Sequence, residues 1–382
     1  MTTPEKEAST VPWWRTELGE AEIEALAQAI RQRHINQGPL CRQLEEQLAA
    51  RLEIPHVATC CSGSVALYLA LAACGVQAGD EVIVPAMSFI ATAHAVLLRG
   101  AVVRLVDVLP EKPLIDADQI EQAVTERTRA IIAVHLNGAA CDMEKINSIA
   151  KRHHLKVIED AAQAFASTGP LGPLGTLGDV ATFSMSIAKL MTTGEGGFVA
   201  TRDAHIHERI LKLRNQGVNN VSDNVFDDFG FNFRFNDMLA SVGLAQLGAL
   251  PQKVEAARRT YEFYRDQVGD LDFLRMMDAD IDGGEVPLWS QVFCADRERV
   301  VALLEERGIQ TRPINPPLCD SPHLGGEGAF PNARRLSRGM LGLPSGPHQD
   351  PSDLQRVVDA LHDISDEMPV LPVSPSGDRT HA

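Results

Sequence analysis

Short apolar runs alternate with longer helical patterns along most of this chain. The runs are rich in β-branched and other apolar residues, and the segments between them place apolar residues three or four positions apart with charges between. This alternation predicts an α/β fold, a mostly parallel seven-stranded sheet with both faces covered by helices. The predicted strands are VATC 57–60, EVIVP 81–85, VVRLV 102–106, AIIAV 130–134, LKVIE 155–159, VATF 180–183 and GFVAT 197–201.

Helical periodicity also predicts how the chain is divided. Amphipathic helices are predicted near the start of the chain, and a long helix follows the segment that begins at Phe229. The remainder mixes helical and extended runs, which is typical of a smaller α+β domain, and the last residues are rich in proline. We expect an N-terminal arm at 1–16, a large domain at 17–250, a small C-terminal domain at 251–366 and a mobile tail at 367–382.

One uncharged stretch, 57–79, is long enough to cross a bilayer. The tripeptide Ser62-Gly63-Ser64 interrupts it, with β-like residues before the interruption and helical residues after it. A strand, a tight turn and a buried helix explain this pattern better than a membrane span.

The charge and the cysteines narrow the classes of function. Lysine and arginine number 35 against 51 aspartates and glutamates, a net charge of −16, so nucleic acid and anionic membranes are poor partners. The seven cysteines are scattered and form no CxxC pair, which argues against a disulfide framework and a structural zinc site. No secretory signal is visible, so we expect a cytoplasmic protein. From the cysteine pattern we expect no metal site.

Candidate chemistry lies after the predicted strands, where open α/β sheets bind their ligands. Ser62-Gly63-Ser64 begins an apolar helix, whose free N–H groups favour a phosphate, although such turns often only cap the helix. Asp160 ends an apolar strand, and its alternative role is a helix cap on the AAQAF segment. Lys189 lies between Ala188 and Leu190; it either points to solvent or, if desolvated, becomes a nucleophile suited to a Schiff base.

Together these signals match what a pyridoxal 5'-phosphate (PLP) site requires: phosphate donors, a strand-end aspartate and a Schiff-base lysine, in that order. The sequence here resembles the DegT/DnrJ/EryC1/StrS family of PLP-dependent sugar aminotransferases, of fold type I in the aspartate aminotransferase superfamily. The resemblance runs over about 13–362. The motifs that carry it are SGSVAL 62–67, GDEVIVPAMSFIATAHAV 79–96, IIAVHLNG 131–138, VIEDAAQAF 157–165, GDVATFSMSIAKLMTTGEGGFVAT 178–201, RNQG 214–217, FGFNFRFNDMLASVGLAQL 229–247 and FPNARRLSRGMLGLP 330–344.

The resemblance implies roles for residues around the PLP ring. Lys189 matches the lysine that forms the internal aldimine and shuttles protons, and its presence argues against the dehydratase branch, which carries histidine there. Asp160 matches the carboxylate that keeps the pyridine nitrogen protonated. Gln163 matches the amide beside the phenolic oxygen, and Phe89 the aromatic that stacks on the ring, with a core phenylalanine as its alternative.

Further roles concern the phosphate and the assembly. Ser184 and the backbone amides of Gly63 and Ser64 match the phosphate cradle. Asn232 matches an asparagine that reaches the phosphate from the neighbouring subunit, which implies a homodimer with shared active sites.

The substrate side departs from the family pattern. Ile314, Asn315 and Cys319 stand in a segment where many members have histidine. Arg234 and Arg312 are candidates for holding an anionic group of the acceptor, and a surface ion pair is the alternative for each.

From this resemblance we expect a ping-pong aminotransferase that moves an amino group from an amino acid such as glutamate to a nucleotide-linked keto-sugar. The alternatives are an aminocyclitol aminotransferase that uses a keto-inositol, and a PLP-binding regulatory protein without turnover.

Overall fold

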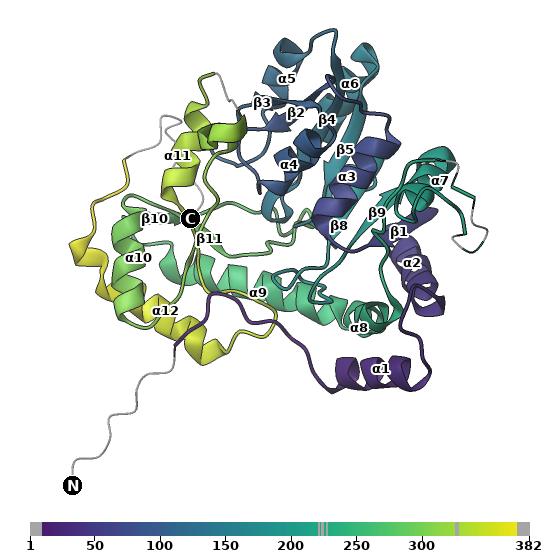
Figure 1. Ribbon diagram of the computed structural model, residues 1–382. Coiled ribbons are helices and arrows are strands. Elements are labelled where there is room, and N and C mark those ends of the chain that lie inside the picture. The colour runs from purple at the N-terminus through teal and green to yellow at the C-terminus, as the bar shows by residue number, and fades with distance from the viewer. Residues whose placement is uncertain (1–9, 221, 223–224, 227, 325–327, 373–382) are drawn as a thin grey trace.

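A computed structural model describes residues 10–372 except 221, 223–224, 227 and 325–327 (Figure 1). Most of the predicted mobile tail, 373–382, and the first nine residues of the arm lie outside the described residues. Among the residues described, no helix combines the length and apolar character needed to cross a membrane.

The larger sheet has seven strands in the order β1-β9-β8-β5-β4-β2-β3. Strands β2, β3, β4, β5 and β8 pair in parallel, whereas β9 runs antiparallel to both β1 and β8. The predicted mostly parallel seven-stranded sheet is therefore confirmed. Its strands are β1 (His56–Cys60), β2 (Glu81–Pro85), β3 (Val102–Val106), β4 (Thr128–Val134), β5 (Lys156–Asp160), β8 (Val180–Ser184) and β9 (Gly197–Thr201).

Residues that alternate along the inner strands bury both faces of this sheet. In β8, Val180 belongs to one hydrophobic core and Phe183 to another, and Phe183 stacks on Phe198 of β9 at 4.4 Å between ring centroids. Because both faces are apolar, these strands appear in the sequence as continuous hydrophobic runs. The helices of this part are α1 (Glu20–Arg31), α2 (Pro39–Leu52), α3 (Gly63–Ala73), α4 (Ala91–Leu98), α5 (Ala117–Ala123), α6 (Met143–His153), α7 (Ala204–Leu213) and α8 (Asp237–Gly248).

One predicted helix is shorter than its pattern. The sequence pattern of IEQAVTERT, 120–128, predicts a helix, but α5 ends at Ala123. The hydroxyl of Thr128 accepts a hydrogen bond from the Thr125 amide at 2.9 Å, and the Thr125 hydroxyl donates to Glu81. These side-chain bonds favour a turn over continued helix.

A long helix, α9 (Leu250–Val268), leads to a second, antiparallel sheet in the order β10-β11-β13-β12 (Figure 1). A separate hydrophobic core lies between this sheet and its helices. The elements are β10 (Leu274–Met276), β11 (Gln291–Cys294), β12 (Arg312–Pro313), β13 (Met340–Gly342), α10 (Arg297–Glu306), α11 (Pro331–Gly339) and α12 (Pro351–Asp363). A two-stranded hairpin, β6 (Thr168–Gly169) and β7 (Gly172–Pro173), follows β5.

Candidate active site

The turn between β1 and α3 places backbone donors at the start of an apolar helix. Ser62 is the N-cap, and its hydroxyl accepts a hydrogen bond from the Val65 amide at 3.2 Å. The amides of Gly63 and Ser64 precede Val65, and the first amides of a helix have no partner within it. With no acidic residue in the first turn of α3, this end of the helix is suited to bind an anion.

Ser184, the last residue of β8, packs directly against this turn. A Cβ atom added to Gly63 would lie 2.8 Å from the Cβ of Ser184 and 3.2 Å from its hydroxyl oxygen. Only glycine therefore allows Ser184 to approach the start of this helix so closely.

A methyl group at Gly63 should weaken phosphate binding. We expect Gly63→Ala to raise the dissociation constant for PLP about tenfold, because the added Cβ displaces Ser184. Gly248→Ala, at a position in α8 where an added Cβ meets nothing within 4 Å, should leave it unchanged. Titration of the apoprotein measures both, and equal constants for the two variants would contradict a cradle at Gly63.

Asp160 is buried at the carboxyl end of β5. Its Oδ2 accepts a hydrogen bond from the Thr92 hydroxyl at 2.8 Å, and its Oδ1 accepts one from the Ala162 amide at 3.2 Å. Burial raises the pKa of this carboxyl, although these hydrogen bonds and the charge of Lys189 act in the opposite direction. Residues 161–167 form turns and no helix, so the alternative reading of Asp160 as a helix cap is wrong.

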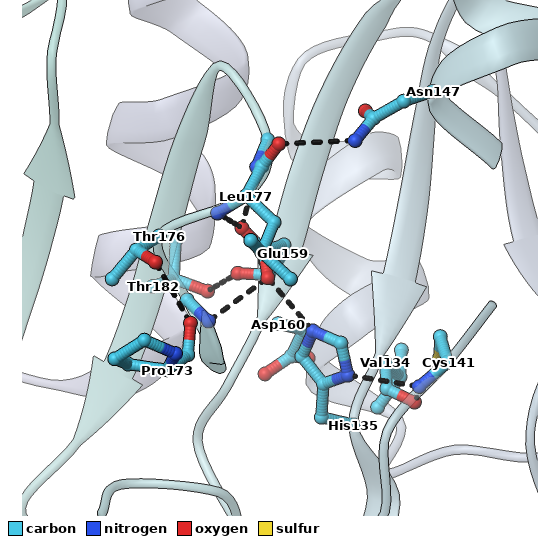
Figure 2. Close-up of polar contacts among 12 residues, drawn as sticks. Val134, His135, Cys141, Asn147, Glu159, Asp160, Pro173, Thr176, Leu177 and Thr182 are labelled. Atoms are coloured by element: carbon cyan, nitrogen blue, oxygen red, sulfur yellow. Dashed lines mark hydrogen bonds and ion pairs between the residues drawn. The ribbon is translucent and has the colours of Figure 1, made fainter. Parts of the chain in front are cut away.

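The neighbouring Glu159 anchors this strand end from the other face of the sheet (Figure 2). Its carboxylate accepts hydrogen bonds from the amides of Gly175, Leu177 and Gly178 and from Nε2 of His135. Burial alone would raise the pKa of Glu159, but the donors hold it below the ordinary value.

His135 completes this anchor. The Cys141 amide donates to Nδ1 at 3.2 Å, and Nε2 donates to the Glu159 carboxylate at 2.9 Å. The amide of His135 donates to the carbonyl of Asp160 at 3.1 Å. These bonds fix the backbone from which the Asp160 side chain extends.

Lys189 lies in the loop between β8 and β9, partly buried, and lines a cavity together with Gln163, Ser184 and Leu288. Its Nζ lies 5.7 Å from the ring centroid of Trp289. Desolvation lowers the pKa of Lys189 to about 8, against the opposing charge of Asp160. At pH 7, Lys189 is then neutral, and therefore nucleophilic, in about one molecule in ten. This agrees with the predicted Schiff-base lysine better than with a lysine that points to solvent.

The N-terminal arm holds the loop that carries Lys189. The Trp14 indole and the Thr16 hydroxyl both donate to the carbonyl of Ile187, at 3.1 and 3.0 Å. Trp13 packs edge-on against Trp289, with 6.1 Å between ring centroids.

Two further predicted residues lie at the same edge of the sheet. Gln163 accepts a hydrogen bond from the Asn137 amide at 2.8 Å, which leaves its NH₂ group to donate elsewhere. Phe89 follows β2 and is 51% exposed, so it is not a core phenylalanine and its ring is open to a planar ligand.

The structure places the remaining predicted residues in two other groups. Arg234 donates to the side-chain oxygens of Asn232 and Asn215, at 3.0 and 3.1 Å. This segment lies beside the turn between β1 and α3, because the Cys61 amide donates to the Phe233 carbonyl. Arg312 is exposed on β12.

The guanidinium of Arg312 lies 5.2 Å from the Trp13 ring centroid. Within the described part of the chain, neither Arg234 nor Arg312 forms a salt bridge, in contrast to the alternative of surface ion pairs.

Sequence reasoning missed three residues that the structure brings to this site. Thr92 was recognisable as a polar residue four positions after Ser88 in an otherwise apolar segment, and the two hydroxyls lie 2.8 Å apart. Trp14 and Trp289 have no local signal, because their contacts with the Lys189 loop join distant segments.

Known proteins of one family resemble this chain over most of its length. The model of the DegT/DnrJ/EryC1/StrS aminotransferase family matches residues 16–362. GDP-perosamine synthase of Caulobacter vibrioides is 35% identical over 332 residues, 84% of this chain and 89% of that protein. The L-glutamine:2-deoxy-scyllo-inosose aminotransferase of Streptomyces lividus is 46% identical over a shorter stretch of 164 residues, 43% of this chain and 39% of that protein.

A solved structure extends the agreement to three dimensions. DesV of Streptomyces venezuelae, determined in complex with a ketimine intermediate, has a TM-score of 0.89 and 32% identity over 94% of this chain and 99% of its own. The resemblance inferred from the motifs is confirmed over nearly their whole extent, and the chain belongs to the DegT/DnrJ/EryC1/StrS aminotransferase family.

Proposed function

We propose that this protein is a PLP-dependent sugar aminotransferase that takes an amino group from glutamate and transfers it to a nucleotide-linked keto-sugar. The observation that carries the proposal is Lys189, with a pKa of about 8, in one cavity with Ser184 and Gln163 and within the field of the buried Asp160. The seven free cysteines support a cytoplasmic location.

The residues present fit PLP. Ser184 and the first amides of α3 would hold its phosphate, and the narrow space at Gly63 is what such a cradle needs. Asp160 would keep a proton on the pyridine nitrogen, and Phe89 offers an exposed ring for stacking. When bound, PLP supplies an electron sink for the negative charge left at the carbon that loses its proton.

Lys189 has two tasks in this mechanism. It would hold the cofactor at Nζ until the amine of the donor takes its place. The free Nζ would then take the proton from the α-carbon of the donor as a base and give it up as an acid to the cofactor carbon that had been bound to Nζ, and a pKa near 8 suits one group to both roles. The Trp289 ring beside Nζ limits access of water. The acceptor ketone uses the same lysine in the reverse direction, after the first product has left.

Asn232 extends the proposal to the assembly. We propose that it reaches the phosphate of a neighbouring subunit in a homodimer. Asn232 is exposed and accepts a hydrogen bond from Arg234, beside the turn between β1 and α3. Both observations support a position at a subunit surface.

A second candidate function is supported by one relative. The 46% identity to an aminotransferase named for 2-deoxy-scyllo-inosose favours a keto-inositol as an alternative acceptor, although the match covers less of the chain. A PLP-binding regulatory protein is the remaining alternative, and it predicts no turnover with any acceptor.

Separate half-reactions test the proposal. The loaded protein is mixed first with glutamate, and after removal of the excess with a series of nucleotide-linked and free ketones, while visible absorption reports each step. Amination of nucleotide-linked ketones supports the proposal. Reaction only with keto-inositols favours the second candidate, and failure of the donor step would exclude both.

Arg312→Ala should separate the two acceptors. The exposed guanidinium over Trp13 is free to bind a phosphate, so its loss should raise KM for a nucleotide-linked acceptor about tenfold while the glutamate step is unchanged. Arg259→Ala, which removes an exposed i,i+4 ion pair on α9, is the matched control. An unchanged KM, or loss of both steps together, would place the acceptor's anion elsewhere; Arg234→Ala is the next variant.

A further inference from the structure

Asn137 holds together two residues of the candidate site. It lies in the turn after β4 with φ 56° and ψ 25°, a left-handed conformation that asparagine tolerates better than most residues. Its side-chain Oδ1 accepts from the Trp289 amide at 2.8 Å, and its Nδ2 donates to the Trp289 carbonyl at 2.9 Å. One side chain thus binds both backbone groups of a residue 152 positions away.

The backbone of Asn137 acts on Gln163. Its amide donates to Oε1 of Gln163 at 2.8 Å, so the amide oxygen of Gln163 is occupied. The NH₂ group is left as the donor, which fixes the polarity of the side chain that lines the cavity with Lys189.

The side chain of Asn137 acts on Lys189 through Trp289. The Trp289 ring lies near Nζ and also contacts the ring of Trp13. Nearby residues have hydrogen bonds of their own: the Val286 amide donates to the Ser167 hydroxyl, and the Ser290 amide donates to the Ser345 hydroxyl. Asn137 is the residue that fixes the backbone of Trp289 itself.

We propose that Asn137 is a positioning residue that sets the Trp289 ring over Lys189 and the Gln163 amide toward the ligand. It acts through its contacts with Gln163 and Trp289. The inference deepens the proposed function, but its test uses the apoprotein and does not depend on turnover.

The pKa of the Lys189 ammonium reports how closely the Trp289 ring packs against it. Its one charged neighbour among the described residues is Asp160, on β5, and the ring and the cavity wall desolvate it. If the ring loosens, water reaches Nζ and the pKa of Lys189 rises from about 8 toward that of an exposed lysine.

Asn137→Gly is the informative variant, because glycine keeps the left-handed backbone and the bond to Gln163 while removing both bonds to Trp289. We expect acylation of Lys189 in the apoprotein at pH 7, followed by mass spectrometry, to slow about tenfold. Hydrogen exchange at the Trp289 amide should become faster. His154→Gly is the control, because it introduces glycine at another left-handed position, the exposed C-cap of α6. It should change neither measurement.

A double-mutant cycle tests the route of the effect. Trp289→Ala alone should slow Lys189 acylation at pH 7 by a similar factor, and adding Asn137→Gly should have little further effect. Unchanged acylation in Asn137→Gly, or in Trp289→Ala should the first variant not fold, would overturn the proposal. A protein that shows these shifts but does not transaminate would contradict the proposed function and leave this inference standing.

Discussion

Lys189→Ala is expected to lower kcat by about 10⁴-fold or more, because one amine both holds the cofactor and moves the proton. The variant should bind PLP through the phosphate cradle yet lack the visible band of the covalently held cofactor. Absorption spectra and single-turnover rates measure the two effects. The apoprotein of the variant should be no less stable than the wild type at neutral pH, because the removed ammonium is partly desolvated.

A second buried lysine provides the control. Lys253 on α9 is almost fully buried, and burial lowers its pKa as well. It differs in donating to the Gln246 side chain and the Glu17 carbonyl, and it does not line the cavity. Lys253→Met should lower the melting temperature and keep the visible band. If that variant also lost the band, or if Lys189→Ala kept its turnover, the assignment of Lys189 would be wrong.

The fold was predictable because its strands are continuous apolar runs. A sheet buried on both faces needs hydrophobic residues at nearly every position, so the runs ending at Pro85 and Val134 could be recognised without knowing their neighbours. The boundary of α5 was not predictable in the same way. It depends on the Thr125 hydroxyl donating to Glu81, a contact 44 residues away.

The site was predictable where its chemistry lies at strand ends. Asp160 and Ser184 follow apolar strands, and Lys189 stands out in an apolar segment. The residues that tune them were not. The hydrogen bond from His135 to Glu159 spans a strand pair, and Asn137 binds the backbone of Trp289, 152 positions away. Such pairs are set by packing, and a single sequence carries no local trace of them.

Asp160→Asn is expected to lower kcat by a factor on the order of 10² while raising the stability of the apoprotein. Burial raises the pKa of Asp160, so the folded state binds its proton more tightly than the unfolded chain does. The contribution of Asp160 to the free energy of unfolding is therefore fully present below the ordinary aspartate pKa of about 4. It is lost as the pH rises through the higher pKa of the folded state. Asparagine carries no such charge, so the melting temperature of the variant should exceed that of the wild type at pH 7.

The two readouts together separate a catalytic carboxylate from one that has no part in the reaction. Asp203 caps α7 by accepting from the His205 and Ile206 amides, and Asp203→Asn should change kcat little because asparagine caps a helix as well. Asn at position 160 can still accept from Thr92, so lost activity would reflect the missing charge. Near-normal kcat in Asp160→Asn would show that the negative charge has no catalytic role. A lower melting temperature at pH 7 would show that the charge stabilises the empty site, contrary to the direction of its pKa.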